Sequence, residues 1–425
     1  MLPALDRARP LPARFADDVA EFRADLAARV MPYWYDTSLD REHGGYLLAD
    51  DAVLPVVPAT TKMLVSQARM VWGFAHAHLN GIRDPERDYL AAAEQGYRFL
   101  IAHFRDREHG GYYWLTDLAG ARLDDRKFIY GQAFVIYGLV EYYRASGERA
   151  ALEHAVDLYR TIQARCRDPV HGGWREHAEA DWQPLRRDGP VPFGIPGLKS
   201  ADAHLHWMEA LSELFAVTRD RKIRISLGAP LQLGSAFREA LQINARFHPR
   251  RPGRSVAFLG ADWSRLAGQR YEFISFGHLV ESAWLMIRAE RILGRRPSWR
   301  HFRALVDYVL RTGYDHERGG AYYRGFAGEP AFNTDKVWWT QAEMLAALAV
   351  GLLRRSDPDY TDALRGLVRF LRAHQIDPQD GIWLDTVAAD GAPLLTGKAH
   401  NWKAAYHDLR ATLMLVDALG VARQP

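Results

Sequence analysis

Hydrophobic residues recur at three- and four-residue spacing along most of the 425-residue chain, as they do on the buried face of an amphipathic helix. Few segments alternate strictly between apolar and polar residues, so long strands are not expected. The pattern predicts twelve helices, at residues 15–30, 62–79, 89–104, 128–144, 149–165, 200–218, 234–246, 276–293, 299–311, 337–354, 359–374 and 403–419.

A turn of the form Asp-x-x-His-Gly-Gly-aromatic separates pairs of these helices. Three strict and two relaxed copies begin at Asp40, Asp106, Asp168, Asp315 and Asp377. The steps between them are 66, 62, 147 and 62 residues, and the long step is about two periods. We therefore expect a sixth, degenerate copy near Asp262, and short β-hairpins formed by the Gly-Gly-aromatic segments at one rim.

Six helical hairpins with a period near 65 residues predict an all-α fold, a closed (α/α)6 barrel in a single domain over residues 1–425. An open solenoid is the alternative, because helical-hairpin repeats usually stack into one. The known solenoid repeats of this kind are shorter, at about 34 to 47 residues, and this favours the barrel.

Charge and cysteine content narrow the class of protein. The 55 Lys and Arg nearly balance the 52 Asp and Glu, which argues against a nucleic-acid or membrane-surface binder. The arginine-rich stretch 247–270 lacks interleaved aromatic residues and is interpreted as a solvated loop. Loop 177–199 is poor in aromatic residues and is expected to pack loosely at the barrel mouth. The single cysteine, Cys166, excludes an intramolecular disulfide and cysteine-based metal clusters.

The first 22 residues are rich in charge and have no apolar signal-peptide core. The longest apolar run, 344–353, is about half the length that a bilayer requires. We expect a cytoplasmic monomer or homodimer that binds neither membranes nor nucleic acids.

Every second helix carries polar and aromatic residues near its N-terminal end. These clusters are Gln67-Ala-Arg69, Tyr130-Gly-Gln132, His204-Leu-His206-x-x-Glu209, His278-x-x-Glu281-x-x-Trp284, Trp338-Trp339-x-Gln341-Ala-Glu343 and Trp402-Lys-x-x-Tyr406-His407. Arg, His and Glu are costly to bury unpaired, so packing alone does not explain them. The clusters predict one site at one end of the ring.

His278 and Glu281 lie three residues apart, so the carboxylate is expected to orient the imidazole and raise its basicity. His206 and Glu209 repeat this spacing. Two such pairs are also compatible with a di-metal site, although no further carboxylates occur at matching spacing. The tryptophans Trp284, Trp339 and Trp402 suit either the core or stacking on sugar rings.

The chain has no phosphate-binding or dinucleotide-binding glycine motif and no nucleophile elbow. What remains is a histidine-rich pocket with an arginine and carboxylates, and with neither metal nor cofactor. Such groups suit proton transfer next to a carbonyl, where the arginine stabilises the developing oxyanion.

The motifs resemble those of the N-acylglucosamine 2-epimerase superfamily of sugar 2-epimerases and aldose–ketose isomerases. The matching segments run in order from Ser66-Gln-Ala-Arg69 to Trp402-Lys-x-x-Tyr-His407 and include Gly277-His-x-x-Glu-Ser-x-Trp284 and Trp338-Trp-x-Gln-Ala-Glu343. The superfamily has an (α/α)6 barrel, which agrees with the helix count. It needs no metal for this chemistry.

The resemblance implies a role for each matching residue. His278 and His407 correspond to the acid/base pair that moves protons through a cis-enediol(ate), and Arg69 lies near the C1 and C2 oxygens. Glu281 corresponds to the residue that tunes His278. The positions that match substrate contacts or the inner-helix carboxylate are His206, Tyr130, Trp284, Trp339, Trp402 and Glu343.

Two departures bear on the substrate. Disaccharide enzymes of the superfamily usually have Pro before the Tyr-His pair, where this chain has Ala405, so free monosaccharides, chiefly D-mannose, are the expected substrates. Members commonly carry Asn at the position of Asp202, which is counted here with the substrate-binding residues. A carboxylate accepts hydrogen bonds but donates none at neutral pH, and this alters hydroxyl recognition there.

The sequence favours interconversion of D-mannose and D-glucose and leaves other functions open. Delivery of the proton to C1 makes a D-mannose/D-fructose isomerase, and a disaccharide substrate makes a cellobiose 2-epimerase. A glycoside hydrolase on the same barrel is the alternative of another class. It needs two carboxylates about 5 to 10 Å apart across the scissile bond.

Overall fold

The computed structural model describes residues 16–52, 58–185, 191–219 and 232–418. Within these ranges the helices are α1 Ala16–Asp25, α2 Met31–Ser38, α3 Leu64–Leu79, α4 Tyr89–Phe99, α5 Ile129–Ser146, α6 Arg149–Arg165, α7 Ala201–Thr218, α9 Leu233–Phe247, α10 Gln269–Glu272, α11 Phe276–Ile292, α12 Trp299–Thr312, α13 Trp338–Arg354, α14 Pro358–Phe370 and α15 His407–Ala418. Turns of π-helix join α1 to α2 and extend α4 and α14, at Leu26–Val30, Leu100–Phe104 and Leu371–Gln375.

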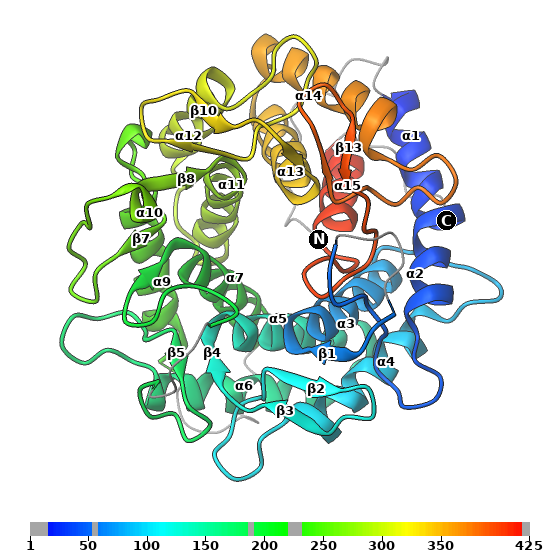
Figure 1. Ribbon diagram of the computed structural model, residues 1–425, viewed down its shortest axis with the longest axis vertical. Coiled ribbons are helices and arrows are strands. Elements are labelled where there is room, and N and C mark those ends of the chain that lie inside the picture. Colours follow the sequence, from blue (N-terminus) through cyan, green and yellow to red (C-terminus); the bar gives the residue numbers. More distant parts are fainter. Residues whose placement is uncertain (1–15, 53–57, 186–190, 220–231, 419–425) are drawn as a thin grey trace.

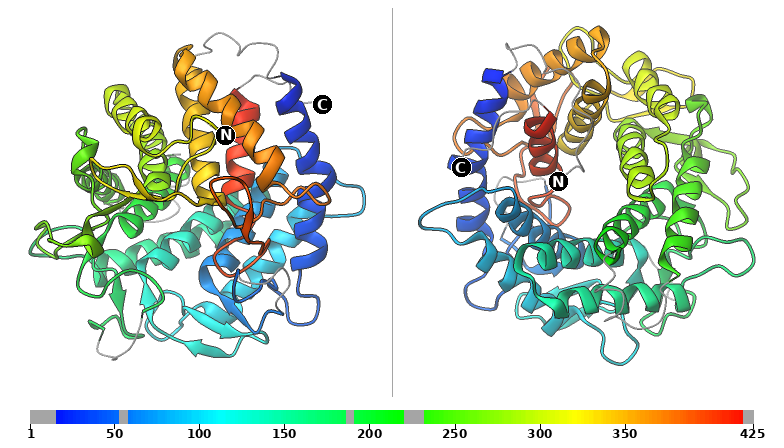
Figure 2. Two further views of the ribbon diagram at one scale, coloured as in Figure 1. Left: turned by 45° about the horizontal axis from the view of Figure 1, so that its top comes forward. Right: turned by 180° about the vertical axis from the view of Figure 1, so that it is seen from behind.

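The helices form two concentric rings, an (α/α)6 barrel as predicted (Figure 1). The inner ring follows the chain through α3, α5, α7, α11, α13 and α15, and neighbours in this order pack on one another. Outer helices α4, α6, α9, α12 and α14 each pack on the inner helix before them, and α1 packs on α15. The view from behind shows both rings (Figure 2).

Burial explains which helices lie inside. Nearly every residue of α13 is buried, in line with its almost continuous apolar sequence, whereas α12 buries one face only. None of the described helices is long and apolar enough to cross a membrane.

Short antiparallel strands lie at one end of the ring, in front of the helices in Figure 1, as the Gly-Gly-aromatic segments predict. They are β1 Thr61–Met63, β2 Leu115–Asp117, β3 Arg122–Asp124, β4 Lys127–Phe128, β5 His177–Ala178, β6 Lys199–Ser200, β7 Phe258–Leu259, β8 Phe273–Ser275, β9 Arg324–Phe326, β10 Ala331–Asn333, β11 Lys336–Val337, β12 Thr386–Val387 and β13 Pro393–Leu395. They pair as β1-β2-β3, β10-β9-β8, β11-β12-β13, β4-β5 and β6-β7, with Lys62 opposite Thr116 in the first sheet.

The repeated turns are held by buried aspartate–lysine pairs. In the second copy, Oδ1 of Asp106 accepts hydrogen bonds from the backbone amides of Glu108 and His109. Its Oδ2 lies 2.9 Å from Nζ of Lys127, just before α5. The same buried ion pair joins Asp40 to Lys62, Asp168 to Lys199 and Asp315 to Lys336, and each of these pairs fixes the strand that leads into an inner helix. In the last copy Asp377 pairs with Lys398, but both side chains are partly exposed and Lys398 lies outside the strands, nine residues before α15.

The spacing predicted the remaining turn near Asp262, but the structure places it elsewhere. It directly follows α9, where Val256 N donates to Phe247 O at 3.2 Å, just as Tyr113 N donates to Phe104 O in the second copy. Ile274 stands two residues before α11, where α3, α5, α7 and α13 have lysine and α15 has Ala405. Pro249 follows Phe247 by two residues, as Asp106 follows Phe104, and it lies 81 residues after Asp168 and 66 before Asp315, so the extra residues of this unit precede its turn.

Two other predicted boundaries change. The first helical segment continues beyond residue 30 to Ser38, and residues 1–15 lie outside the described structure. The last helix begins at His407 rather than at residue 403. His400 and Lys403 exchange backbone hydrogen bonds of 3.1 and 2.7 Å, and Ala405 N donates to Sδ of Met70, so this segment is non-helical.

Candidate active site

The N-terminal ends of the inner helices surround a cavity of about 450 Å³. Eight of the eleven residues predicted from sequence line it, namely Arg69, Tyr130, Asp202, His206, His278, Trp339, Trp402 and His407. Helix N-termini carry partial positive charge, so their convergence favours a substrate that develops negative charge.

Three histidines in the cavity wall each bring Nδ1 to a carboxylate. His206 Nδ1 lies 2.9 Å from Oε2 of Glu209 on the same helix, as predicted. His278 on α11 lies 2.9 Å from Oδ1 of Asp202 on α7. His407 on α15 lies 2.6 Å from Oε1 of Glu343 on α13. Each contact leaves Nε2 of the ring available to a ligand.

The predicted partnership between His278 and Glu281 is therefore wrong. Asp202 reaches His278 from the neighbouring inner helix. Oε1 of Glu281 instead accepts a hydrogen bond of 2.9 Å from Arg410. The sequence spacing places Glu281 on a suitable helix face, but this position lies deeper in the barrel, where a cation competes for it.

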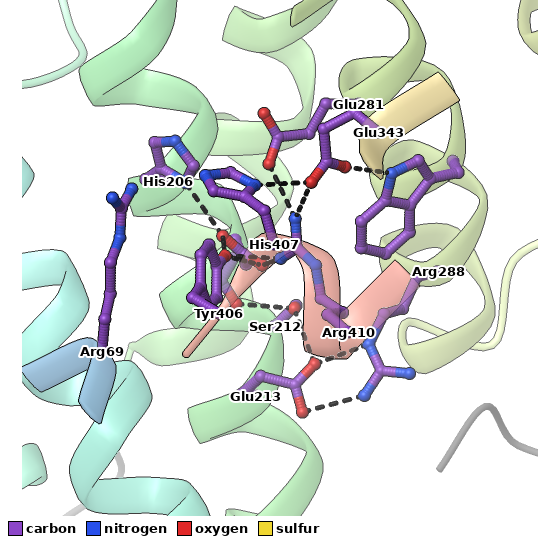
Figure 3. Close-up of polar contacts among 12 residues, drawn as sticks. Arg69, His206, Ser212, Glu213, Glu281, Arg288, Glu343, Tyr406, His407 and Arg410 are labelled. Atoms are coloured by element: carbon purple, nitrogen blue, oxygen red, sulfur yellow. Dashed lines mark hydrogen bonds and ion pairs between the residues drawn. The ribbon is translucent and has the colours of Figure 1, made fainter. Parts of the chain in front are cut away.

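Arg410 joins three buried carboxylates beneath the cavity (Figure 3). Its guanidinium donates to Glu209, to Glu281 and, at 2.7 Å, to Glu343. Burial and the charge of Glu343 raise the pKa of Glu281 well above its ordinary value, although Arg410 opposes the shift. Glu281 is thus held in its neutral form.

Glu281, Glu343 and Trp284 lie behind the cavity wall rather than in it, which corrects the predicted contact of Glu343 and Trp284 with substrate. The indole nitrogen of Trp284 donates to Oε2 of Glu343 at 2.9 Å, while Oε1 of Glu343 holds His407. These residues support His407 from below.

His407 is surrounded by groups that disfavour its protonation. Burial, and then the positive charges of Arg69 and Arg410, hold the pKa of His407 well below its ordinary value. Burial also lowers the pKa of His206. His407 is therefore a neutral imidazole near neutral pH, as a base requires.

Arg69 is buried at the cavity wall, and its guanidinium is held by hydrogen bonds to two acceptors. It donates to Oη of Tyr130 and to the carbonyl of Trp402, each at 3.0 Å, and its Cζ lies 4.1 Å from the ring centre of Phe134. Burial raises the pKa of Tyr130 to about 12, so its hydroxyl stays protonated. The guanidinium is placed to stabilise an oxyanion in the cavity.

Several cavity residues were missed by sequence reasoning because they lie on rim loops without periodic pattern. Phe193, from the loop expected to pack loosely, stacks on Tyr130 with ring centres 4.0 Å apart. Asp385 and His400 form a pair of 2.9 Å between Oδ2 and Nε2. His248, in the turn after α9, also lines the cavity. The aromatic side chain of Phe193 was a usable sequence signal, whereas Asp385, His400 and His248 offered none.

Among the residues that the structure describes, two groups of side chains have spacing compatible with a metal ion, His206–Glu209–Glu281 and Glu281–Glu343–His407. The guanidinium of Arg410 already supplies positive charge to all three carboxylates. We therefore expect prolonged EDTA treatment to leave the rate of sugar turnover unchanged, measured against an untreated sample. A clear loss that added Mg²⁺, Mn²⁺ or Zn²⁺ restores would contradict this.

Comparisons with known proteins agree with this site. The profile of the N-acylglucosamine 2-epimerase (GlcNAc 2-epimerase) family matches residues 44–411. The chain is 28% identical to cellobiose 2-epimerase of Bacteroides fragilis, over 94% of this chain and 98% of that one. It is 25% identical to D-mannose isomerase of Marinomonas mediterranea, over 92% and 95%.

The solved structure of cellobiose 2-epimerase from Spirochaeta thermophila superposes with a TM-score of 0.83 at 30% identity, covering 97% of this chain and 98% of that one. The cavity in a helical barrel, with its histidines and buried arginine, and the matching family and relatives together identify an isomerase or epimerase of carbohydrates. The chain belongs to the N-acylglucosamine 2-epimerase family.

Proposed function

We propose that this protein is a 2-epimerase of free reducing sugars, with a β-1,4-linked glucose disaccharide such as cellobiose as its main substrate. The observation that carries the proposal is the pair of imidazoles, His278 and His407, that face one cavity beside Arg69. Each imidazole has a carboxylate on Nδ1 and a free Nε2. Two such groups can serve opposite faces of one carbon.

The reaction follows from these positions. With the sugar ring open, Nε2 of neutral His407 takes the proton from C2, and the C–H electrons form the C1–C2 double bond. The negative charge that develops on O1 is stabilised by Arg69. After rotation of the intermediate, His278 returns a proton to the other face of C2. Exchange with solvent restores both histidines, so atoms and charge balance.

Aromatic lining and similarity both support a disaccharide over the free mannose expected from Ala405. Phe193, Tyr130 and Trp402 offer aromatic surface to a second sugar ring. Relatives named cellobiose 2-epimerase support the same substrate.

A D-mannose isomerase is the second candidate, favoured by the relative of that name. A glycoside hydrolase fits less well. A family 76 mannosidase shares the fold with a TM-score of 0.60 at 10% identity, which is a likeness of fold alone. Glu209, Glu281 and Glu343 all contact Arg410, and none of them lines the cavity where a glycosidic bond would lie.

Proton NMR of cellobiose and of D-mannose, each incubated with the protein in D₂O, tests the proposal. We expect the 2-epimer of cellobiose, glucosyl-mannose, with deuterium at C2 of the reducing sugar. Fructose deuterated at C1, formed from mannose with little glucose, would support the isomerase instead. Absence of product and of C2 exchange with both sugars would refute the two-histidine mechanism. Release of glucose from cellobiose would favour hydrolysis.

A further inference from the structure

We propose that Asp202 is a positioning residue that fixes the proton-bearing form of His278 and so assigns the acid and base roles of the two cavity histidines. Its carboxylate accepts a hydrogen bond from Nδ1–H of His278 and so directs Nε2 of that ring to the substrate. The catalytic meaning of this pair rests on the proposed function, whereas the pair itself is a feature of the resting protein.

Two helix N-termini hold the pair in register. Asp202 lies in the first turn of α7, where Oγ of Ser200 caps Ala203 N at 3.2 Å. His278 lies in the first turn of α11, where Oγ of Ser275 accepts its backbone N–H at 3.4 Å. The ring of Trp339 lies 4.6 Å from that of His278 and limits its rotation. The 2.9 Å contact is therefore built by three elements.

Asp202 differs from Glu209 and Glu343, the other two carboxylates that contact cavity histidines, in the positive charges next to it. Glu209 and Glu343 both accept hydrogen bonds from Arg410, so an arginine neutralises part of the charge that His206 and His407 experience. Among the described residues no arginine pairs with Asp202, and its ion-pair partner is His278. The full carboxylate charge is thus available to that imidazole.

Other ionisable groups surround the pair. They include His206 on α7, His248 after α9, Tyr130 on α5 and Tyr323, while Arg69 on α3 is close enough to act on His206. Burial holds the pKa of His248 at about 3, so it stays neutral. Burial raises the pKa of Asp202, but the charge and hydrogen bond of His278 outweigh it, and the pKa lies below its ordinary value.

The consequence is an asymmetric pair of histidines in the resting enzyme. His407, between two arginines, is the neutral base, and His278, held through Nδ1 by an uncompensated carboxylate, directs its Nε2 to the substrate as the group that delivers a proton to C2.

Two substitutions separate the charge of Asp202 from its hydrogen bond. Asp202→Asn keeps an acceptor for Nδ1–H but removes the charge, and the basic limb of the kcat/KM–pH profile for cellobiose is expected to move about one unit lower. Asp202→Leu removes both, and kcat is expected to fall by about 10- to 100-fold with a smaller change in KM. Glu141→Gln is the control, because it removes the carboxylate on His76, a buried pair outside the cavity lining, and should not move that limb.

A measurement on the resting protein makes the test independent of turnover. Long-range ¹H–¹⁵N spectra, with the His278 ring assigned by its loss in His278→Gln, are expected to show Nδ1 protonated in the wild type and a mixture of tautomers in Asp202→Leu. Unchanged ring shifts in Asp202→Leu, or an unmoved basic limb in Asp202→Asn, would overturn the proposal. Absence of C2 exchange in the wild type would instead refute the proposed function, and the spectra would then test the hydrogen bond between Asp202 and His278 by themselves.

Discussion

His407→Asn is expected to lower kcat/KM for epimerisation by about 10²- to 10⁴-fold, the range that a positioned general base contributes. Asparagine keeps a donor for Glu343, whose Oε1 lies 2.6 Å from Nδ1 of His407, but it cannot take the C2 proton. The midpoint of thermal unfolding should stay within a few degrees. The measurement is C2 proton exchange in D₂O, with thermal unfolding followed by circular dichroism.

The pH profile and a matched histidine sharpen this prediction. Because burial and two arginines lower the pKa of His407, the base stays active as pH falls to 6.5, and the acid limb lies below that value. His204 on α7 is also buried, but it contacts Ser200 O and lies outside the cavity lining. His204→Asn should keep kcat within a few fold. Retention of more than a tenth of the activity in folded His407→Asn would exclude His407 as the base.

Arg410→Met is expected to lower the free energy of unfolding by about 3–5 kcal/mol, because it removes one partner of a buried ionic cluster. Glu209, Glu281 and Glu343 would then lie together in the barrel without the guanidinium that contacts all three. Methionine roughly preserves the volume of the side chain, so the loss reports charge rather than a cavity. Urea unfolding of the variant and the wild type measures it.

The pH dependence of the variant has a definite sign. Carboxylates whose pKa is raised in the folded state bind more protons there than in the unfolded chain, so the variant should regain stability as pH falls from 7 to 5. Glu281→Gln is the control. The pKa of Glu281 is already raised, so the glutamine should change stability by less than about 1 kcal/mol. A small loss in Arg410→Met that does not vary with pH would contradict the role of Arg410.

Cavity residues on regular helices were largely predictable, whereas those on rim loops were not, except Trp402, whose motif leads into the last inner helix. Arg69, His206, His278 and His407 lie at or near the starts of inner helices, where a polar side chain interrupts an apolar pattern. His248, Asp385 and His400 reach the same cavity from loops, whose paths depend on contacts with distant segments. Periodicity carries no information about such paths.

The same spacing had different outcomes in two helices. His206 and Glu209 pair as expected, but His278 and Glu281 do not. His278 lies one turn nearer its helix start than His206 does, so it meets the first turn of α7, where Asp202 is available. The spacing defines a shared helix face, and the neighbouring helices decide which partner on that face is reached.

The sequence by itself determined the order of the helices that form the two rings, the barrel, the family and eight of the residues that line the cavity, because these follow from local periodicity and short motifs. Only the tertiary structure decided which carboxylate serves which imidazole and which charges Arg410 neutralises. Those pairings join residues far apart in the chain, such as Glu209 and Arg410. Their energies depend on distance and burial, which no linear pattern specifies.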